Sequence, residues 1–521
     1  MLAPPAYLLR PAAALLALAL ILSGCAAYAA PAPQAPTPTP RRGSAQPSPT
    51  PAPADPFLAA QSAALLPAHV GDLARAAEWD RYTIIAALLP GALQLRGTAA
   101  VELTNRSTDP YERLYFHLYP NHPDFGGRLA VTSASVDGQP VRSGTEHGDT
   151  LIWLALPRPI PPGGSTRVEL GFTAQTPRNA SRDTFGAFNY EAGLWSLANF
   201  YPVLARYFPG TGWDRRPIVS RGDFAVTATA LYDVTVDVPA GWELVTTGAQ
   251  VSSAPVRDGV RRERYVSGPQ REFYLGAVQG LDQASVTVDG TRIVSHYQPD
   301  DAAAGRRALR VAEQSLLAFN ARFGRYPLAE LEVIQGAMTQ FLGMEYPGVV
   351  LIEQELYASN SRGLETTVAH EVAHQWWYSQ VGSDAQGEPW LDEGLTSYAQ
   401  VIYYEWLGQR ELALAELDYF RSLYRSSREQ RRDVPLATPP AELRGIYVPI
   451  AYAKGALFFH ALRAQIGEEA FERFLQGYYS AGRYREVAGS DLLRAAEAAC
   501  SCELDPLFND WVLTAARVPI P

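Results

Sequence analysis

The chain has 521 residues, of which 47% are hydrophobic and 11% are aromatic, and its formal net charge is −10. The aliphatic and aromatic content predicts a large buried core, and the negative charge argues against nucleic acid as a partner. This length exceeds what one hydrophobic core supports, so we expect more than one folded domain.

Residues 1–25 have the pattern of an export signal. Arg10 supplies a positive charge, residues 11–22 are almost wholly Ala, Leu and Ile, and small residues precede Cys25. The apolar stretch is too short to span a bilayer. Its end, Leu-Ser-Gly-Cys, resembles the bacterial lipoprotein signal, which implies a lipid on Cys25 and anchoring to a bacterial membrane outside the cytoplasm. Plain secretion is the alternative.

Residues 26–55 are predicted to be a disordered linker. They consist mainly of Pro, Ala, Thr, Ser and Gln, a composition that cannot bury a core. Such a chain favours polyproline II, and at about 3.1 Å per residue it would reach up to roughly 90 Å from the membrane.

Cysteine usage agrees with an oxidising compartment. Apart from Cys25 the chain has one pair, Cys500 and Cys502. These two either form a disulfide or are small residues near the end of a helix.

Residues 56–285 are predicted to form an N-terminal β-sandwich. Apolar and polar residues alternate with period two, which indicates half-buried antiparallel strands. Turn sequences, such as Pro-Pro-Gly-Gly at 161–164 and Asp-Gly at 289–290, separate the strands. The clearest alternating positions are Val168, Leu170, Phe172 and Ala174, and Tyr232, Val234, Val236 and Val238.

Residues 286–521 are predicted to form a second domain in which a short sheet is followed by helices. Residues 331–334 and 349–352 have the pattern of strands, and the chain from 364 onward is predicted to be mostly helical, including residues 375–377. A first helix is predicted from apolar residues spaced by three and four, ending at Gly324: Leu309, Ala312, Leu316, Phe319 and Phe323.

The sequence His-Glu-Val-Ala-His at 370–374 predicts a metal site. His370 and His374, at i and i+4, lie on one face of a helix and can both bind one Zn²⁺. Glu371 would lie beside the metal as the general base for a zinc-bound water. Glu393, at the start of a second predicted helix, would be the third ligand, leaving one position open as in a catalytic zinc site. An ordinary amphipathic helix with two half-exposed histidines is the alternative.

His-Glu-Val-Ala-His-Gln-Trp-Trp, followed by Trp-Leu-Asp-Glu-Gly-Leu-Thr-Ser-Tyr at 390–398, resembles the gluzincin metallopeptidases of the aminopeptidase N (membrane alanyl aminopeptidase) family. Residues 343–346, Gly-Met-Glu-Tyr, are similar to that family's G-x-M-E-N motif, and residues 452–455, Tyr-Ala-Lys-Gly, to its Y-x-K-G motif. The resemblance implies a saddle-shaped β-sandwich followed by a thermolysin-like zinc peptidase domain, with one Zn²⁺ per chain.

The resemblance also implies roles for individual residues. Tyr452 would stabilise the oxyanion of the tetrahedral intermediate, and Tyr447 would support it. Glu345 would pair with the α-ammonium group of a peptide, which makes the enzyme an exopeptidase, and the backbone of Gly343 and Met344 would lie against the substrate. The remaining histidines show no ligand spacing and are expected to be structural: His69, His117, His122, His147, His296 and His460.

Two departures from the family pattern leave the specificity open. Tyr346 takes the place of the family's Asn, and Pro347 restricts its backbone. No equivalent of an amine-binding Gln is evident in residues 194–202. The sequence therefore predicts a zinc aminopeptidase acting on peptides outside the cytoplasm. A zinc endopeptidase or altered peptidase on the same scaffold, and an inactive peptide-binding surface lipoprotein, are the alternatives.

Overall fold

The computed structural model describes residues 55–177, 186–338, 340–358, 362–515 and 518–521. The predicted signal at 1–25 with its Cys25, and the predicted linker up to residue 54, lie outside the described residues. Asp55 already belongs to the fold, because its side chain caps α1 (Pro56–Gln61) and pairs with Arg81.

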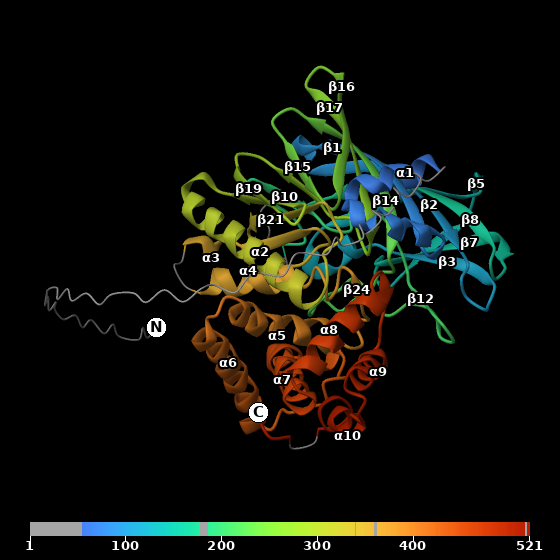
Figure 1. The fold of residues 1–521 in the computed structure, drawn as a ribbon. Coiled ribbons are helices and arrows are strands. Elements are labelled where there is room, and N and C mark those ends of the chain that lie inside the picture. The colour runs from blue at the N-terminus through green and yellow to red at the C-terminus, as the bar shows by residue number, and fades with distance from the viewer. Residues whose placement is uncertain (1–54, 178–185, 339, 359–361, 516–517) are drawn as a thin grey trace, which may run out of the picture. The chain divides into compact units, whose positions relative to one another are not determined.

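The first half of the described chain is built from β-sheets (Figure 1). Within the described residues the largest sheet has eight strands in the order β16-β17-β14-β1-β2-β8-β4-β5. Its pairs are antiparallel except for β1 and β14, which run parallel, so the prediction of a purely antiparallel sandwich was too simple. The strands are β1 (Asp80–Leu89), β2 (Gln94–Thr104), β4 (Arg128–Val136), β5 (Gln139–Pro140), β8 (Ser165–Gln175), β14 (Ala230–Pro239), β16 (Ala249–Arg257) and β17 (Val260–Gln270).

Smaller sheets pack against this one. In the described part of the chain, two four-stranded sheets have the orders β15-β18-β10-β9 and β11-β3-β7-β6, and β12 pairs with β13. The predicted alternation holds on β8, where Val168, Leu170 and Ala174 are fully buried. The strands are β3 (Tyr111–His117), β6 (Ser143–Glu146), β7 (Leu151–Ile160), β9 (Phe188–Glu191), β10 (Leu194–Leu197), β11 (Val203–Leu204), β12 (Tyr207–Phe208), β13 (Gly212–Trp213), β15 (Glu243–Thr246) and β18 (Leu275–Val278).

A mixed sheet connects the β-rich half to the helices. Its order is β19-β20-β21-β23-β22, with parallel pairs at β20–β21 and β21–β23. The Asp289-Gly290 turn, at positive φ in both residues, joins its first two strands as predicted. The sheet begins slightly before the predicted boundary at 285, and the division into two domains stays a prediction. The strands are β19 (Asp282–Val288), β20 (Thr291–Tyr297), β21 (Glu330–Gly336), β22 (Gly343–Met344) and β23 (Val349–Glu353).

The rest of the chain is mostly helical, and α2 and α4 pack against this mixed sheet (Figure 1). Gly324, with φ of 126°, follows the end of α2 as predicted. No helix among residues 55–521 that the structure describes is both long and apolar enough to cross a membrane. The elements are α2 (Ala302–Arg322), α3 (Glu355–Ala358), α4 (Gly363–Ala373), β24 (Val381–Gly382), α5 (Trp390–Trp406), α6 (Arg410–Glu429), the π-helix η8 (Val448–Lys454), α7 (Gly455–Ile466), α8 (Glu468–Gly482), β25 (Arg485–Glu486), α9 (Gly489–Cys500), α10 (Asp505–Phe508) and the π-helix η9 (Asn509–Leu513).

Short 3₁₀ helices connect these elements: η1 (Ser62–Ala64), η2 (Pro67–Glu78), η3 (Pro90–Ala92), η4 (Tyr119–Asn121), η5 (Pro123–Phe125), η6 (Pro299–Asp301) and η7 (Pro440–Glu442). The prediction that residues 375–377 continue the helix of the metal motif was wrong. Helix α4 ends at Ala373, and His374 is its C-cap. The backbone N–H groups of Gln375 and Trp376 then donate to the carbonyls of Val372 and Ala373, three residues earlier in each case. Cys500 and Cys502 form a disulfide with their Cα atoms 5.2 Å apart.

Candidate metal centre and peptide-binding site

Three side chains from two helices converge on one point. Nε2 of His370 lies 3.2 Å from Nε2 of His374, and Oε2 of Glu393 lies 3.3 Å from the first and 3.4 Å from the second. Tetrahedral zinc with bonds of about 2.0–2.1 Å separates its ligand atoms by about 3.3 Å. All three side chains are more than nine-tenths buried. The triad therefore has the spacing that a zinc ion requires.

Neighbouring groups fix the orientation of both imidazole rings. Nδ1 of His374 donates to the carbonyl of Trp377 at 3.1 Å and lies 3.3 Å from the Thr396 hydroxyl. Nδ1 of His370 lies 2.9 Å from the side-chain amide of Gln400. With a proton on its Nδ1, His374 presents its Nε2 lone pair to the metal position, and the amide nitrogen of Gln400 holds the His370 ring at its Nδ1.

The general-base candidate Glu371 lies beside the triad and is buried. Gly343, at the start of β22, packs directly against its carboxylate, and a Cβ at that position would overlap it. A larger residue here would have to displace the Glu371 carboxylate, so the glycine leaves that group in place where the edge strand passes the zinc helix. This contact accounts for the glycine of the segment at 343–346 and places the backbone of that segment at the site.

Tyr452 points at the triad from η8. Its hydroxyl donates to Oε1 of Glu393, and its ring stacks on His370 with 5.5 Å between centroids. Tyr447 packs edge-on against Tyr452 at 5.8 Å, and its hydroxyl lies against Gly222, which comes from the β-rich half. The structure thus brings both predicted tyrosines to the metal position.

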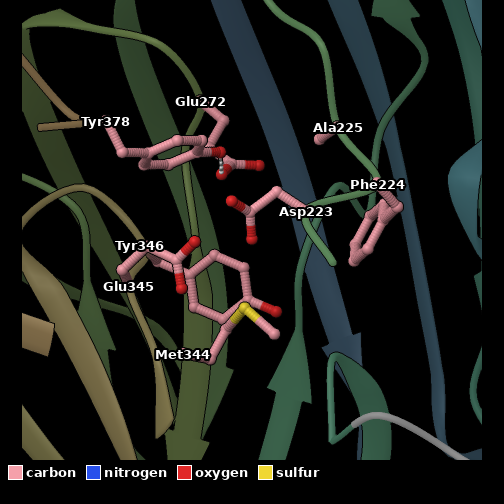
Figure 2. Close-up of a pocket in the computed structure, with 8 residues that line it drawn as sticks. All are labelled: Asp223, Phe224, Ala225, Glu272, Met344, Glu345, Tyr346 and Tyr378. Carbon is pink, nitrogen blue, oxygen red and sulfur yellow. Dashed lines mark hydrogen bonds between the residues drawn. The ribbon is translucent and has the colours of Figure 1, made fainter. Parts of the chain in front are cut away.

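Glu345 opens onto a small pocket beside the triad (Figure 2). One carboxylate oxygen of Glu345 lies within 4.8 Å of ligand atoms of Glu371 and His374. The pocket is lined by residues 223–225 and 344–346, with Glu272 and Tyr378. The predicted specificity residue therefore lies next to the metal triad and faces groups from the β-rich half.

Tyr346, which departs from the family pattern, does not block this arrangement. Its ring stacks on Tyr274 of the β-rich half, with 4.4 Å between centroids, and it lines the pocket. Its carbonyl accepts a hydrogen bond from the side chain of Gln375, the residue after His374. The motif loop is thereby tied to the zinc helix, with the Glu345 carboxylate left facing the pocket.

The four central groups perturb one another strongly. Burial favours the neutral carboxyl of Glu393, but its hydrogen bonds and charge interactions with His370 and His374 lower its pKa to about 2. Burial likewise opposes a charge on His374, yet Glu393 raises its pKa to about 10. Burial lowers the pKa of His370 and raises the pKa of Glu371 to about 8.

Comparison with known proteins agrees with this geometry. Residues 307–511 match the model of the peptidase family M1 domain. The chain is 27% identical to aminopeptidase M1 of Arabidopsis thaliana over 415 residues, which cover 74% of this chain and 45% of the relative. It is 27% identical to aminopeptidase N of Lactococcus lactis over 197 residues, covering 36% of this chain and 23% of that protein. The matched region, residues 307–511, thus has the sequence pattern of a peptidase family M1 domain.

A solved M1 zinc metallopeptidase from Deinococcus radiodurans has a similar fold. Its TM-score is 0.62 at 22% identity, and the alignment covers 85% of this chain and 95% of that one. A mutant of the same protein has been solved with a Tyr-Ser-Ala substrate. The predicted fold class, antiparallel sheets followed by a mostly helical C-terminal region, is thereby confirmed. The chain spans less than half the length of the plant M1 relatives.

Sequence reasoning missed several residues of this site. Gln400 lies seven residues after Glu393, so helical periodicity could have placed it on the same face of α5. Asp223 and Glu272 belong to no recognised motif, and only the fold brings them to Glu345. The segment at 194–202 does reach this region, because the amide of Asn199 donates to Glu272 at 2.7 Å.

Proposed function

We propose that the protein is a zinc-dependent aminopeptidase that removes N-terminal residues from peptides outside the cytoplasm, anchored to a bacterial membrane through Cys25. The observation that carries the enzymatic part is the triangle of His370, His374 and Glu393 with ligand atoms 3.2–3.4 Å apart. The match of residues 307–511 to the M1 domain and the peptide bound to the structurally similar Deinococcus protein support the same activity. The location rests on the pattern of residues 1–25.

Zinc held by this triad would supply Lewis-acid chemistry, which lowers the pKa of water and polarises a peptide carbonyl. Glu371 accepts the proton of the attacking water and returns it to the leaving amine. Its burial and its position one step round α4 from His370 suit this role.

Tyr452 acts as a hydrogen-bond donor in this scheme. Burial and the nearby charge of Glu393 raise the pKa of its phenol well above the usual range. The hydroxyl therefore keeps its proton at neutral pH and can donate to the oxyanion that develops on the carbonyl oxygen.

Glu345 fixes which peptide bond is cleaved. The α-nitrogen of a peptide is separated from the first carbonyl carbon by a single atom. A carboxylate within 4.8 Å of the atoms around the metal position can therefore hold the α-ammonium while the first peptide bond lies over the metal. This arrangement selects free N-termini.

The test is hydrolysis of a panel of aminoacyl-aminomethylcoumarins by the full chain, before and after chelation and after zinc is added back. We expect turnover that chelation removes and zinc restores. Glu371→Gln should lower kcat by about 10²–10⁴-fold while zinc stays at one per chain. The exposed Glu469→Gln is the matched control and should keep full activity.

Two results would contradict the proposal. An N-acetylated peptide that is cleaved as fast as the free peptide would indicate an endopeptidase on this scaffold. Absence of turnover with one zinc bound per chain, for every substrate of the panel and for longer peptides, would indicate a peptide-binding protein instead.

A further inference from the structure

We infer that a polar cavity between β15 and the mixed sheet binds an extended peptide segment with a basic side chain, and that this segment adds to β15 as a further strand. The inference goes beyond the proposed function, because none of the described residues that line this cavity also lines the pocket at Glu345. Three features of the molecule support it: the open edge of β15, the charges that face the cavity, and the space inside it.

The cavity lies between one face of the mixed sheet and the segments from β15 to β17 (Figure 1). In β20 and β21, Arg292 lies opposite Glu330, and Val294 lies opposite Glu332. Side chains alternate between the two faces of a strand, so these four residues share one face with His296. The alternate positions of both strands pack with α2 in one core cluster. The sheet therefore presents charged side chains to the cavity and apolar ones to the helix.

Strand β15 presents an unpaired edge to this cavity. Its four residues, 243–246, all line the cavity. Within the described chain β15 pairs only with β18, so alternate residues direct their N–H and C=O groups away from that partner. The buried hydroxyl of Thr246, on the same strand, has no hydrogen-bond partner among the described residues. Such an edge can bind an extended chain through main-chain hydrogen bonds.

The charges of the cavity favour a cationic ligand. Four glutamates and two arginines line it, so its net charge is negative when His296 is neutral. Glu332 binds His296 at 2.8 Å, and Glu263 pairs with Arg261. Glu330 has no hydrogen bond or ion pair among the described residues, and burial together with the charge of Glu332 raises its pKa. An unpaired, partly buried carboxylate is stabilised by a cation.

Neither a metal ion nor the protein itself supplies that cation. In the described chain, the groups of three ligand atoms within 4.8 Å of one another both lie at His374, outside this cavity. Arg292, which is next to Glu330 in the sheet register, is exposed and forms no ion pair with it. The positive charge that Glu330 lacks must therefore come from a ligand.

An extended peptide satisfies both requirements at once. The cavity has a volume of about 260 Å³, which accommodates a long side chain. Successive side chains of a strand point to opposite faces, so the backbone of a peptide can pair with β15 while a lysine or arginine side chain faces Glu330.

The test measures binding of Ac-Thr-Arg-Val-Arg-Thr-NH₂ to the zinc-loaded full chain by titration calorimetry. The acetyl group removes the α-ammonium that the proposed aminopeptidase activity would recognise. We expect Glu330→Gln to weaken binding by roughly tenfold, because one partner of a partly buried charge pair is lost.

Two analogues test the strand pairing. One is N-methylated at both arginines, and the other is N-methylated at the valine and the second threonine. Strand addition uses the N–H groups along one edge of the peptide, so at least one analogue should bind about tenfold more weakly.

Controls separate this role from a general effect of charge or folding. Glu429→Gln, at an exposed acid in the last turn of α6, should bind the peptide as wild type does. A peptide with glutamate in place of both arginines should not bind measurably. If Glu330→Gln does not fold, as judged by thermal unfolding, Glu243→Gln at the exposed start of β15 is measured in its place and should also weaken binding.

Four results would overturn the inference. The first is equal binding of the arginine and glutamate peptides, and the second is unchanged binding of both N-methylated analogues. The third is binding that Glu345→Gln removes and Glu330→Gln leaves intact, since the peptide then occupies the metal centre. The fourth is the absence of binding at millimolar peptide.

Discussion

Glu393 is the residue on which the contacts of the site converge. Its Oε2 faces both histidines, and its Oε1 accepts the hydroxyl of Tyr452. The ring of Tyr452 also stacks on His370. The carboxylate of Glu393 thus contacts both histidine ligands and the predicted oxyanion donor, Tyr452. Because the ring of Tyr452 is also held by stacking on His370, its hydroxyl can be removed while the ring stays in place.

Tyr452→Phe should lower kcat by about 10²–10³-fold with little change in KM, because the lost donor acts on the transition state. Zinc content should stay at the wild-type value, since His370, His374 and Glu393 are unaltered. Steady-state kinetics and metal analysis check this prediction. Tyr419→Phe, at a 55% exposed tyrosine, is the control. A kcat equal to that of wild type would assign the oxyanion role to another group.

At the scale of elements, the site depends on how closely α5 approaches α7. Gly394 follows Glu393 on α5, and Gly455 begins α7 just after Tyr452 and Lys454. A Cβ on Gly394 would lie 2.9 Å from the Cα of Gly455, and a Cβ on Gly455 would lie 2.7 Å from the Cα of Gly394. The two motif glycines therefore touch, and their contact sets the separation between Glu393 and Tyr452.

Lys454 anchors the same region from the other side. Its ammonium is fully buried and donates to Asp433 at 3.0 Å and to the carbonyl of Val434 at 2.6 Å. Every other basic residue of the chain is Arg. A compact ammonium fits this enclosed position, whereas a planar guanidinium is larger and needs more acceptors. These hydrogen bonds join η8, which carries Tyr452, to the segment that follows α6.

Gly394→Ala should destabilise the fold by about 1–3 kcal/mol, because an added methyl group forces two packed helices apart. It should also lower kcat, since Glu393 and Tyr452 move with those helices. Gly477→Ala, in the middle of α8, is the matched control. A Cβ there meets no atom within 4 Å, and we expect a gain of about 0.5–1 kcal/mol. Urea unfolding and kinetics measure both effects, and equal stabilities for the two variants would refute the tight-contact explanation.

At the scale of the whole molecule, the two halves share their cores. Leu65 and Trp79, from the start of the described chain, belong to the same buried cluster as the catalytic helices. Ile334 and Leu351 of the mixed sheet belong to the cluster of the β-rich half. The site lies between groups from both halves, because Glu345 and Asp223 come from opposite sides of this shared boundary. We therefore expect core substitutions in the β-rich half to lower the free energy of unfolding of the whole molecule.

His117, in β3, makes unfolding sensitive to acid. Burial lowers its pKa in the folded protein from 6.5 to about 4. Between these values the unfolded chain binds a proton that the folded chain does not, so stability is complete above pH 6.5 and falls as the pH drops toward 4. The loss approaches about 3 kcal/mol.

His117→Phe keeps a ring against Tyr119 and removes this titration. Between pH 6.5 and 4, we expect the free energy of unfolding of this variant to fall by up to about 3 kcal/mol less than that of wild type. Urea unfolding across that pH range measures the difference. The interpretation fails if His117→Phe retains the wild-type slope.

The sequence by itself determined the features that depend on local periodicity. The spacing of His370 and His374 places both rings on one face of α4, and alternation on β8 and the steps of α2 predict strand and helix correctly. The position of Glu393 after the metal motif predicted the third ligand, and motifs in the expected order then gave the resemblance to the family, with the roles predicted for Tyr452 and Glu345.

Tertiary structure alone decided the features that depend on distant segments. The contact between Gly394 and Gly455, the meeting of Asp223 and Glu345 at one pocket, and the parallel pairing of β1 with β14 join residues far apart in the chain. No local pattern encodes such neighbours, because they follow from how completed helices and sheets pack. The residues for zinc chemistry can therefore be predicted from the sequence, whereas the pocket that would determine substrate specificity depends on packing between the two halves.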